Sequence, residues 1–188
     1  MELRRACDHK HMPWKNGKGE TVEIAVFPSN AAIGDFGWRV STASVDTDGP
    51  FSLFDDIDRT LSVIEGQGIK LSVAGADPIS LNIGSQPFSF PGDVQTSASL
   101  LNGPIKDLNI MTRRGRFSHR VKKVEGLQQI SFDQTAEVTI LLALSAARID
   151  ERELGPLDAA IFQSISFKEH VLVEASGNFF RIDIFAVR

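Results

Sequence analysis

Short apolar runs separated by turn-forming residues dominate the pattern of hydrophobic and polar positions along this chain. Trp38–Val45 alternates in character, and two apolar, β-branched runs follow at residues 61–64 and Ile69–Val73. Because successive side chains of a strand point to opposite faces, these runs predict three strands. Residues 46–50 and 65–68 are rich in Asp, Gly and Pro, and they predict the turns between them.

Similar runs recur along the rest of the chain, and residues 107–113 alternate most clearly. The other strand candidates are residues 3–6, 23–27, 79–83, 117–121, 127–132, 137–144, 161–165, 170–173 and 179–187. Roughly a dozen short strands spaced by turns favour a β-sandwich or barrel. Residues 148–153 are interpreted as a charged loop, and a short helix at residues 148–154 is the alternative. The predicted fold class is therefore all-β, with antiparallel strands and little helix.

Composition narrows the class of protein. At 188 residues, the chain has room for one large domain or two small, closely joined ones. Hydrophobic residues make up 42% and charged residues 23%, as in an ordinary globular protein. A net charge of −4 without a basic block argues against a nucleic-acid partner. The single cysteine, Cys7, cannot form an internal disulfide, which fits a reducing compartment.

No apolar run approaches the roughly 18 residues of a membrane-spanning helix. The first residues also lack the apolar core of a secretory signal peptide. We therefore expect a cytoplasmic protein that does not associate with a membrane.

Three familiar kinds of site find little support. His9 and His11 lie one residue apart, but no third ligand has a convincing spacing, so a solvated pair is the preferred interpretation. Cys7 has no obvious base, and no nucleophile elbow is present. Residues 16–19 resemble part of a phosphate-binding loop, but they lack the Walker spacing and precede a strand.

Polar residues on two predicted strands form the favoured candidate site. Arg39 and Ser41 share one face of the first strand, and Asn109, Met111 and Arg113 share one face of the other. Arginine is suited to bidentate binding of a carboxylate. The alternative is that this face of each strand simply meets water.

Two further residues each have two interpretations. Trp14 could form a wall of such a pocket, or it could anchor the beginning of the chain in the core. Arg59 could lie in a surface turn, or it could point into a barrel and pair with Asp55 or Asp56.

Taken together, several motifs resemble the HutD/Ves family. They are Trp14-Lys15-Asn16-Gly17 with Gly19-Glu20-Thr21, Trp38-Arg39 with Ser41 and Ala43, Phe51-Ser52-Leu53-Phe54 with Arg59 and Gly66, Phe88 to Asp93, and Leu108 to Arg113. The matches span roughly residues 13 to 115, and the last third fits only by its strand pattern. The chain departs from the family's common glycine triplet at Lys18, which would alter one edge of the pocket.

The resemblance implies a cupin-type double barrel, or bicupin, in one compact unit of residues 1–188. The first barrel, with its N-terminal loop, would span approximately residues 13–115 and the second approximately residues 116–188. A weak similarity of residues 155–158 to 90–93 and of 182–187 to 108–113 fits two related halves. The resemblance also implies a link to histidine utilisation in the HutD branch, or to cold and stress response in the Ves branch.

The comparison with cupins bears on metal binding. Metal cupins carry two histidines one residue apart, then a glutamate and a glycine. Alignment on Gly66 places Ser52, Phe54 and Arg59 at the three ligand positions, and a later histidine position falls near Gln95. None of these three is a usual transition-metal ligand, so we expect neither a metal nor another cofactor.

The main functional hypothesis is a metal-free cupin that binds a small carboxylate metabolite of histidine catabolism, as a regulator or sensor. Urocanate, formylglutamate and formiminoglutamate are the ligands that the resemblance suggests. The expected ligand-binding residues are Trp14, Asn16, Gly17, Thr21, Arg39, Ser41, Arg59, Asn109, Met111 and Arg113. Arg39 or Arg59 would pair with the carboxylate.

Two alternatives remain open. The first is a metal-independent enzyme acting on such a metabolite, with Asp107 or Glu20 as the general base. The second is a homodimeric interaction protein without a small-molecule ligand. Of the two classes, a binding protein is favoured over an enzyme.

Overall fold

The computed structural model describes residues 1–14, 19–163 and 172–187. These residues are almost entirely antiparallel β-structure, and the only helix among them is the 3₁₀ turn η1 (Ala6–Asp8). The predicted all-β class with little helix is confirmed. Within the same residues, no helix is both long and apolar enough to span a membrane.

The chain divides into two compact units, each described here by itself. The central unit is Lys10–Arg116, and the terminal unit combines Met1–His9 with Phe117–Arg188. The first residues of the chain belong to the terminal unit because β1 (Glu2–Arg4) pairs with β16 (Ala159–Gln163).

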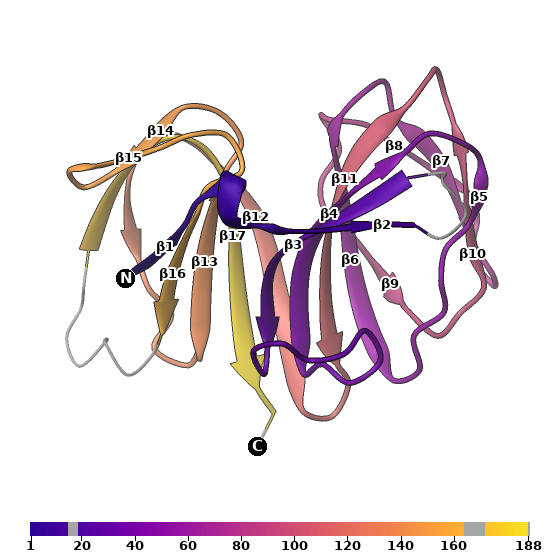
Figure 1. Cartoon of the computed structure of the whole chain (residues 1–188), viewed down its shortest axis with the longest axis horizontal. Helices are drawn as coiled ribbons and strands as arrows, with labels where there is room; N and C mark the ends of the chain where they lie inside the picture. The colour runs from indigo at the N-terminus through magenta and orange to yellow at the C-terminus, as the bar shows by residue number, and fades with distance from the viewer. Residues whose placement is uncertain (15–18, 164–171, 188) are drawn as a thin grey trace. The chain divides into compact units, whose positions relative to one another are not determined.

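The described part of the central unit contains two sheets (Figure 1). The six-stranded sheet runs in the order β2 (Lys10–Pro13), β3 (Gly19–Phe27), β4 (Trp38–Val45), β11 (Ile105–Arg113), β6 (Ile57–Glu65) and β9 (Phe88–Pro91). The four-stranded sheet runs in the order β5 (Gly49–Pro50), β10 (Thr96–Leu100), β7 (Ile69–Val73) and β8 (Ile79–Leu81).

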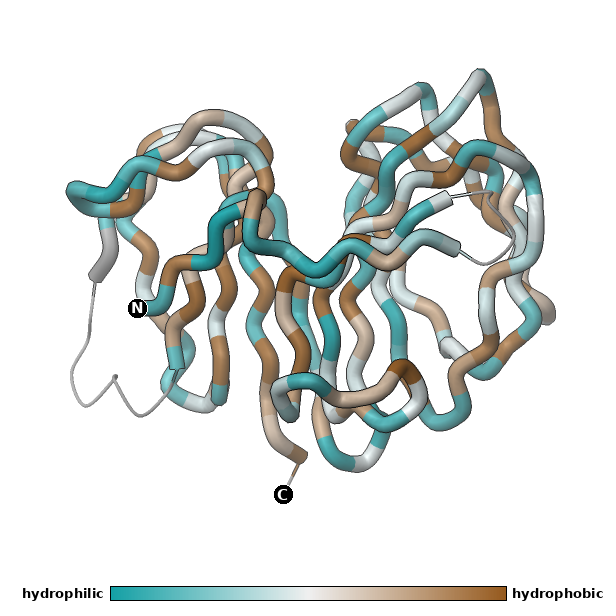
Figure 2. The backbone as a smooth tube through the Cα atoms, viewed as in Figure 1, coloured by the Kyte–Doolittle hydropathy of each residue, from teal (hydrophilic) through white to brown (hydrophobic). Residues whose placement is uncertain are grey.

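An apolar core fills part of the space between these two sheets. Leu61 and Val63 from β6 pack with Leu71 from β7 and Ala98 from β10. Apolar and polar residues alternate along the strands, as the changing colours of Figure 2 show, so one face of each strand contributes to this interior. We refer to the space between the two sheets as the interior of the central unit.

Several strands of the central unit differ from the prediction, because β2, β5, β9 and β10 were not predicted and β3 and β6 begin earlier than expected. β6 begins at Ile57 rather than at residue 61, so Arg59 lies within a strand and not in a turn. β10 was missed because its sequence, TSASL, has few large apolar residues. Its Thr96 and Ala98 are nevertheless buried, since small side chains suffice where β10 packs over the core.

The terminal unit contains a seven-stranded sheet among its described residues. Its further strands are β12 (Phe117–Ser131), β13 (Val138–Ala143), β14 (Ala147–Ile149), β15 (Arg152–Leu154) and β17 (Leu172–Ala186). Different parts of β17 pair with β13 and with β14. The sheet folds over in this way, and Leu141, Phe162 and Phe179 pack with Ile149 and Leu154 in one core.

Neither the charged loop preferred for residues 148–153 nor the alternative of a short helix at residues 148–154 is correct. The segment forms the hairpin β14–β15, whose turn contains Asp150 with φ of 51°. Ile149 and Leu154 are buried on the core side of this hairpin, and that burial outweighs the helix propensity of the charged residues between them. The two predicted strands at residues 117–121 and 127–132 are one strand, β12. Parts of the candidates at 161–165 and 170–173 lie outside the described residues.

Two glycines in turns of the central unit give a matched test of backbone packing. Gly66 and Gly75 have φ of 91° and 86°, so an alanine is strained similarly at both. A Cβ at Gly66 would collide with the backbone oxygen of Pro104 and lie 2.8 Å from Cγ2 of Ile105, whereas nothing lies within 4 Å of a Cβ at Gly75.

We therefore expect Gly75→Ala to lower the free energy of unfolding by about 1 kcal/mol. Gly66→Ala should lower it by about 2 kcal/mol more, because backbone must also move. Chemical denaturation of both variants measures the difference. If both variants lost the same amount of unfolding free energy, the close packing of the β6–β7 turn against the start of β11 would be contradicted.

Candidate functional site

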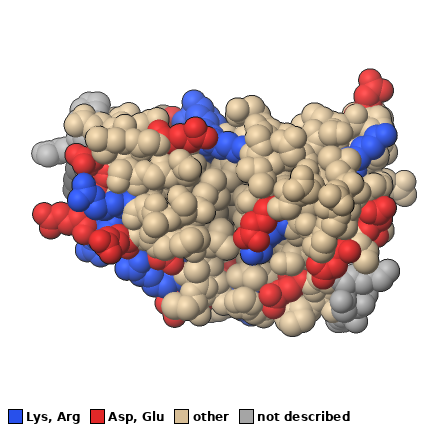
Figure 3. All heavy atoms as spheres, turned by 90° about the horizontal axis from the view of Figure 1, so that it is seen from above, with Lys and Arg blue, Asp and Glu red and all other residues tan. Residues whose placement is uncertain are grey.

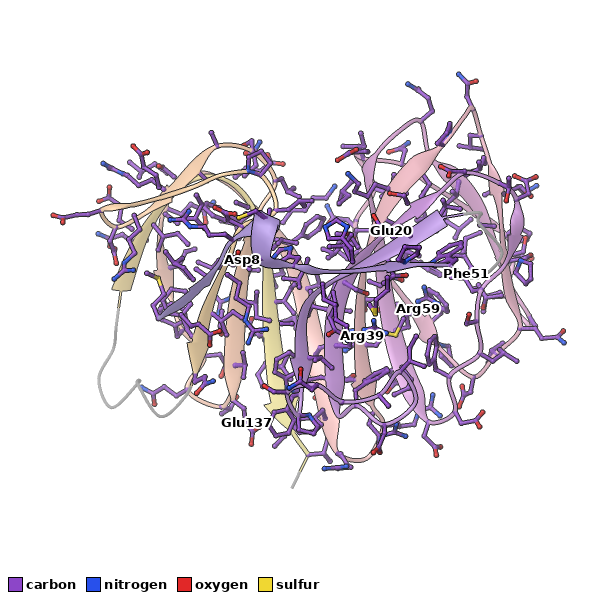
Figure 4. All side chains as sticks on the ribbon, in the orientation of Figure 1. Asp8, Glu20, Arg39, Phe51, Arg59 and Glu137 are labelled. Atoms are coloured by element: carbon purple, nitrogen blue, oxygen red, sulfur yellow. The ribbon has the colours of Figure 1, made fainter. Side chains whose placement is uncertain are left out.

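Five of the residues expected to bind a ligand lie on one face of three adjacent strands. Met111 on β11 is opposite Arg39 on β4 and opposite Arg59 on β6, and Asn109 is opposite Ser41. All five are buried, and Figure 4 shows Arg39 and Arg59 within the central unit. The interpretation in which this face meets water is therefore wrong, and these side chains belong to the interior.

Arg59 is held by an amide and by two aromatic rings. Its Nε donates a hydrogen bond of 2.8 Å to Oδ1 of Asn109, and its Nη2 donates to the same oxygen. The Cζ atom lies 4.4 Å from the centre of the Phe51 ring and 5.5 Å from that of Phe90. Burial lowers the pKa of Arg59 to about 10, which still leaves the guanidinium charged at neutral pH.

Of the two interpretations of Arg59, the surface turn is wrong, and the inward orientation holds without the suggested pairing with Asp55 or Asp56. Those residues lie in an exposed turn before β6, whereas Arg59 points to the interior. Arg59 forms no ion pair with any carboxylate that the structure describes. It is therefore a buried cation whose direct partners are a neutral amide and aromatic rings.

Asp107 continues the chain of hydrogen bonds from Arg59. Nδ2 of Asn109 donates to Oδ1 of Asp107 at 2.6 Å, and only 1% of Asp107 is exposed. Its other oxygen, Oδ2, has no hydrogen-bond partner of good geometry in the described part of the chain. Burial raises the pKa of Asp107 to about 6, although the charge of Arg59, the Asn109 amide and the Ala43 backbone partly oppose this shift.

Arg39 has a different environment from Arg59. Its Nε lies 2.9 Å from Oε2 of Glu23 on β3, and its Nη2 lies 3.6 Å from Sδ of Met12 on β2. Burial lowers the pKa of Arg39, and the Glu23 carboxylate opposes that effect. Glu23 and Met12 were missed in the sequence. Glu23 is a single acidic residue among the apolar residues of a predicted strand. That position was the indication in the sequence that its carboxylate faces a cation.

Trp14 and Thr21 lie at the edge of this arrangement. The indole Nε1 of Trp14 donates a hydrogen bond of 2.8 Å to Oγ1 of Thr21, and both side chains are partly buried. Thr21 is opposite Ala43 in the register, so it shares a face with Asp107. The expected ligand-binding residues Asn16 and Gly17 lie outside the described residues, as does Lys18.

Arg113 occupies the end of β11 and binds backbone. Its guanidinium donates to the carbonyl oxygens of Phe36, at 3.1 Å, and of Gly34, at 2.9 Å. These bonds attach the segment before β4 to the end of the sheet. Met111, by contrast, is 5% exposed and packs with Phe36 and Ile57.

The alternative base Glu20 lies away from the interior. It is opposite Ser44, on the other face of β3 from Thr21, and its carboxylate lies 3.1 Å from Nδ1 of His11. Of the two carboxylates considered as a general base, only Asp107 faces the interior.

The residues of the interior do not fit a divalent cation. Of the aligned metal-ligand positions, Ser52 is exposed, Phe54 packs with Phe36 at a ring distance of 6.1 Å, and Arg59 is a buried guanidinium. A second guanidinium, that of Arg39, lies on the same face, and both would repel a metal ion. Among residues 1–14, 19–163 and 172–187, no group of three His, Cys, Asp or Glu side chains could hold a metal.

The terminal unit also buries an acid among arginines, but every oxygen of that acid is used. Asp183 is 1% exposed and accepts a hydrogen bond of 2.8 Å from Thr139 at Oδ1. Arg181 lies 3.0 Å from both oxygens, and Arg120 lies 3.1 Å from Oδ2. This cluster is complete as it stands, unlike the one around Asp107.

A pocket lies beside strands β5, β7 and β10 of the four-stranded sheet. Its volume is ≈ 470 Å³, and it is lined by Pro50, Phe51, Leu53, Ser72, Val73, Ala74, Gln95, Thr96 and Ser97. Phe51 belongs to this lining and also stacks on Arg59. On the face drawn in Figure 3, basic and acidic side chains are interspersed.

The fold and its polar interior define a cupin-type protein. Bacterial pirin YhhW from Escherichia coli, solved in complex with nickel(II), covers 100% of this chain with a TM-score of 0.65. At 10% identity this similarity concerns the fold alone.

The chain belongs to the HutD family, whose model matches residues 6–180. The structure of HutD from Pseudomonas fluorescens SBW25, in a formate condition, has a TM-score of 0.88 and 30% identity, and covers 100% of this chain and 99% of that one. An uncharacterised 21.2 kDa protein in the hutC 3′ region of Pseudomonas putida is 33% identical over 82% of this chain and 79% of its own.

Protein Ves from Citrobacter koseri is also similar. It is 43% identical to this chain, and the match covers 61% of each of the two. The predicted resemblance to the HutD/Ves family is therefore confirmed.

The raised pKa of Asp107 makes a prediction about stability. Below about pH 4 the group is protonated in both the folded and the unfolded state. Between about pH 4 and pH 6 the unfolded chain loses this proton while the folded protein keeps it, so stability falls as pH rises. Above the folded-state pKa the loss is complete, and two pKa units correspond to roughly 3 kcal/mol.

Asp107→Asn removes this titration. Relative to the wild type, the variant should gain up to roughly 3 kcal/mol of unfolding free energy between about pH 4 and pH 7. Chemical denaturation across this range measures the difference, with Asp77→Asn, at an exposed position of the same unit, as the control. If the unfolding free energies of the wild type and of Asp107→Asn changed with pH in the same way, the raised pKa of Asp107 would be contradicted.

Proposed function

We propose that this protein is a metal-free bicupin that binds a small carboxylate metabolite in the interior of its central unit. Its role would be regulatory or sensory, in histidine catabolism. The observation that carries the proposal is Arg59, a buried guanidinium that makes no ion pair with a described carboxylate. Three further observations support the proposal: the charges of the interior, the unused donors of the arginines and the context of the relatives.

The charges of the interior favour an anion. Burying a cation is unfavourable unless it is paired, and the direct partners of Arg59 supply only an amide oxygen and two rings. The carboxylate of Glu23 pairs with Arg39 instead. The nearest opposite charge, that of Asp107, acts on Arg59 only through the Asn109 amide. A ligand carboxylate would bind Arg59 directly, and the planar fork of a guanidinium can bind two of its oxygens.

The donors of the two arginines are not all used. Arg59 bonds through Nε and Nη2, and Arg39 interacts through Nε and Nη2. Nη1 of each guanidinium has no partner among residues for which contacts are described. Met111 lies between these arginines in the register, and Ser41 and Asn109 lie two residues away on the same face, where they can bind the remainder of a small ligand.

The context of the relatives suggests the kind of carboxylate. One relative lies in a hutC 3′ region, and the HutD structure was obtained in a formate condition. Urocanate, formylglutamate and formiminoglutamate are the carboxylates of histidine catabolism that the family resemblance suggests. The regulatory role rests on this context and not on the site itself.

The bicupin part of the proposal concerns the terminal unit. Its sheet folds over its own apolar core, as the two sheets of the central unit enclose theirs. We propose that each unit is one cupin barrel. Because Asp183 in the terminal unit is fully bonded, we place the ligand in the central unit alone.

A second candidate function is catalysis without a metal. Asp107 faces the interior, is fully buried and has a pKa of about 6, which are properties of a general base. Turnover of a bound carboxylate that is abolished in Asp107→Asn would favour this function over a sensor.

The proposal predicts that Arg59→Met weakens carboxylate binding by about 2 kcal/mol or more, or about 30-fold in Kd. Arg39→Met should have a similar effect if both guanidiniums contact the ligand. Isothermal titration calorimetry with urocanate, formylglutamate and formiminoglutamate measures the loss. Methionine keeps the length and apolar body of the side chain, so it suits the aromatic surroundings of Arg59.

Arg152→Met, at an exposed position of the terminal unit, is the matched control and should bind as the wild type does. Thermal unfolding of each variant establishes that the fold is intact. Unchanged affinity in a folded Arg59→Met protein would refute the assignment of Arg59 to the site.

A further inference from the structure

The side chain of Met12 brings a thioether into contact with a buried guanidinium. Its Sδ accepts a hydrogen bond of 3.6 Å from Nη2 of Arg39, of which only 4% is exposed. A thioether sulfur is a weak acceptor. Arg59, Arg113 and Arg114 of the same unit donate to oxygen atoms instead. An oxygen atom at the position of this sulfur would therefore be a better partner for the Arg39 cation.

Met12 also lies where a small oxidant can reach it. It is partly exposed on β2, the last strand at one end of the six-stranded sheet. The other two methionines of the chain bracket this exposure, because Met1 is 41% exposed and Met111 is 5% exposed. Met12 thus combines access for solvent with a bond to a buried cation.

Hydrogen peroxide converts a thioether to a sulfoxide in one two-electron step. A lone pair of the sulfur attacks one peroxide oxygen, so that an S–O bond forms and the O–O bond breaks. The transferred oxygen gives its proton to the departing hydroxide, which leaves as water. Sulfur is oxidised, peroxide is reduced, and methionine sulfoxide reductases can reverse the change.

We propose that Met12 is an oxidation site, at which the new sulfoxide oxygen accepts a hydrogen bond from Nη2 of Arg39. The sulfur already lies 3.6 Å from Nη2, and an N–H···O bond has a length of about 2.7 to 3.2 Å. The unbranched side chain of methionine can turn about its three rotatable bonds. The oxygen can therefore reach Nη2 while Met12 stays paired with Thr21 in the β2–β3 register.

The effect of this oxidation differs from that of an ordinary methionine oxidation. A sulfoxide is polar, and it usually disrupts the apolar contacts of the thioether that it replaces. Here the oxygen replaces a weak bond to Arg39 with a charge-assisted one, so β2 stays attached to the sheet. The sulfoxide would also compete with a ligand for Arg39, and this last consequence alone rests on the proposed function.

Treatment of the folded protein with hydrogen peroxide tests the site itself. Peptide mass spectrometry should show one added oxygen at Met12, at a rate within about tenfold of that at Met1, because oxidation follows exposure. Met111 should stay unmodified until the protein unfolds, and a methionine sulfoxide reductase should remove the oxygen from Met12. A folded protein that is fully oxidised at Met1 and unmodified at Met12 would overturn the proposal.

Two variants test the bond to Arg39 without oxidation. Met12→Gln carries an amide oxygen near the position of the sulfoxide oxygen, whereas Met12→Leu is apolar and cannot be oxidised. The Tm of Met12→Gln should exceed that of Met12→Leu by at least about 2 °C, because only glutamine can accept from Nη2. A lower Tm for Met12→Gln would overturn the proposed bond.

Thermal unfolding of peroxide-treated protein completes the test. Oxidation should leave the Tm of the wild type unchanged or raise it, and a clear fall would overturn the proposed bond. Met12→Leu is the matched control, because peroxide still oxidises Met1 in it, and its Tm should not change. None of these measurements uses a carboxylate ligand, so their outcome is independent of the proposed function.

Discussion

The hydrogen-bond chain from Arg59 through Asn109 to Asp107 is the interaction on which the interior of the central unit depends. It links β6 to β11 through side chains and places opposite charges on either side of a neutral amide. Phe51 and Phe90 cover the cationic end, which excludes water and strengthens each electrostatic contact in the chain. These contacts fix the orientation of the buried Arg59 guanidinium.

Much of this arrangement follows from strand periodicity. Residues of the same parity on Trp38–Val45 and Ile105–Arg113 share a face, so Arg39, Ser41, Asn109 and Met111 could be grouped before any pairing was known. Arg59 could not be placed in the same way. The acidic residues before it resemble a turn, and only the pairing of β6 with β9 and β11 shows that the strand begins earlier.

The parts of the site that sequence reasoning missed depend on partners distant along the chain. Glu23 becomes the partner of Arg39 only because β3 lies beside β4, with a bulge between Glu23 and Ala25. The perturbation of Asp107 depends on its burial between two sheets, and alternation along one strand cannot reveal how dry that position is. The loop or short helix considered for residues 148–154 was wrong for the same reason, because tertiary burial determines the hairpin.

The register irregularity between Lys106 and Asp107, where β11 pairs with β6, has a wider consequence. The backbone hydrogen bonds between strands can form equally well in a register shifted by one residue. Such a shift would turn Leu108 and Ile110 toward the interior and Asp107 away from it. Correct pairing of three strands is thus a condition for the polar interior to exist at all. A molecule that contacts both β6 and β11 would hold these two strands together. Its binding would therefore make this part of the sheet more rigid.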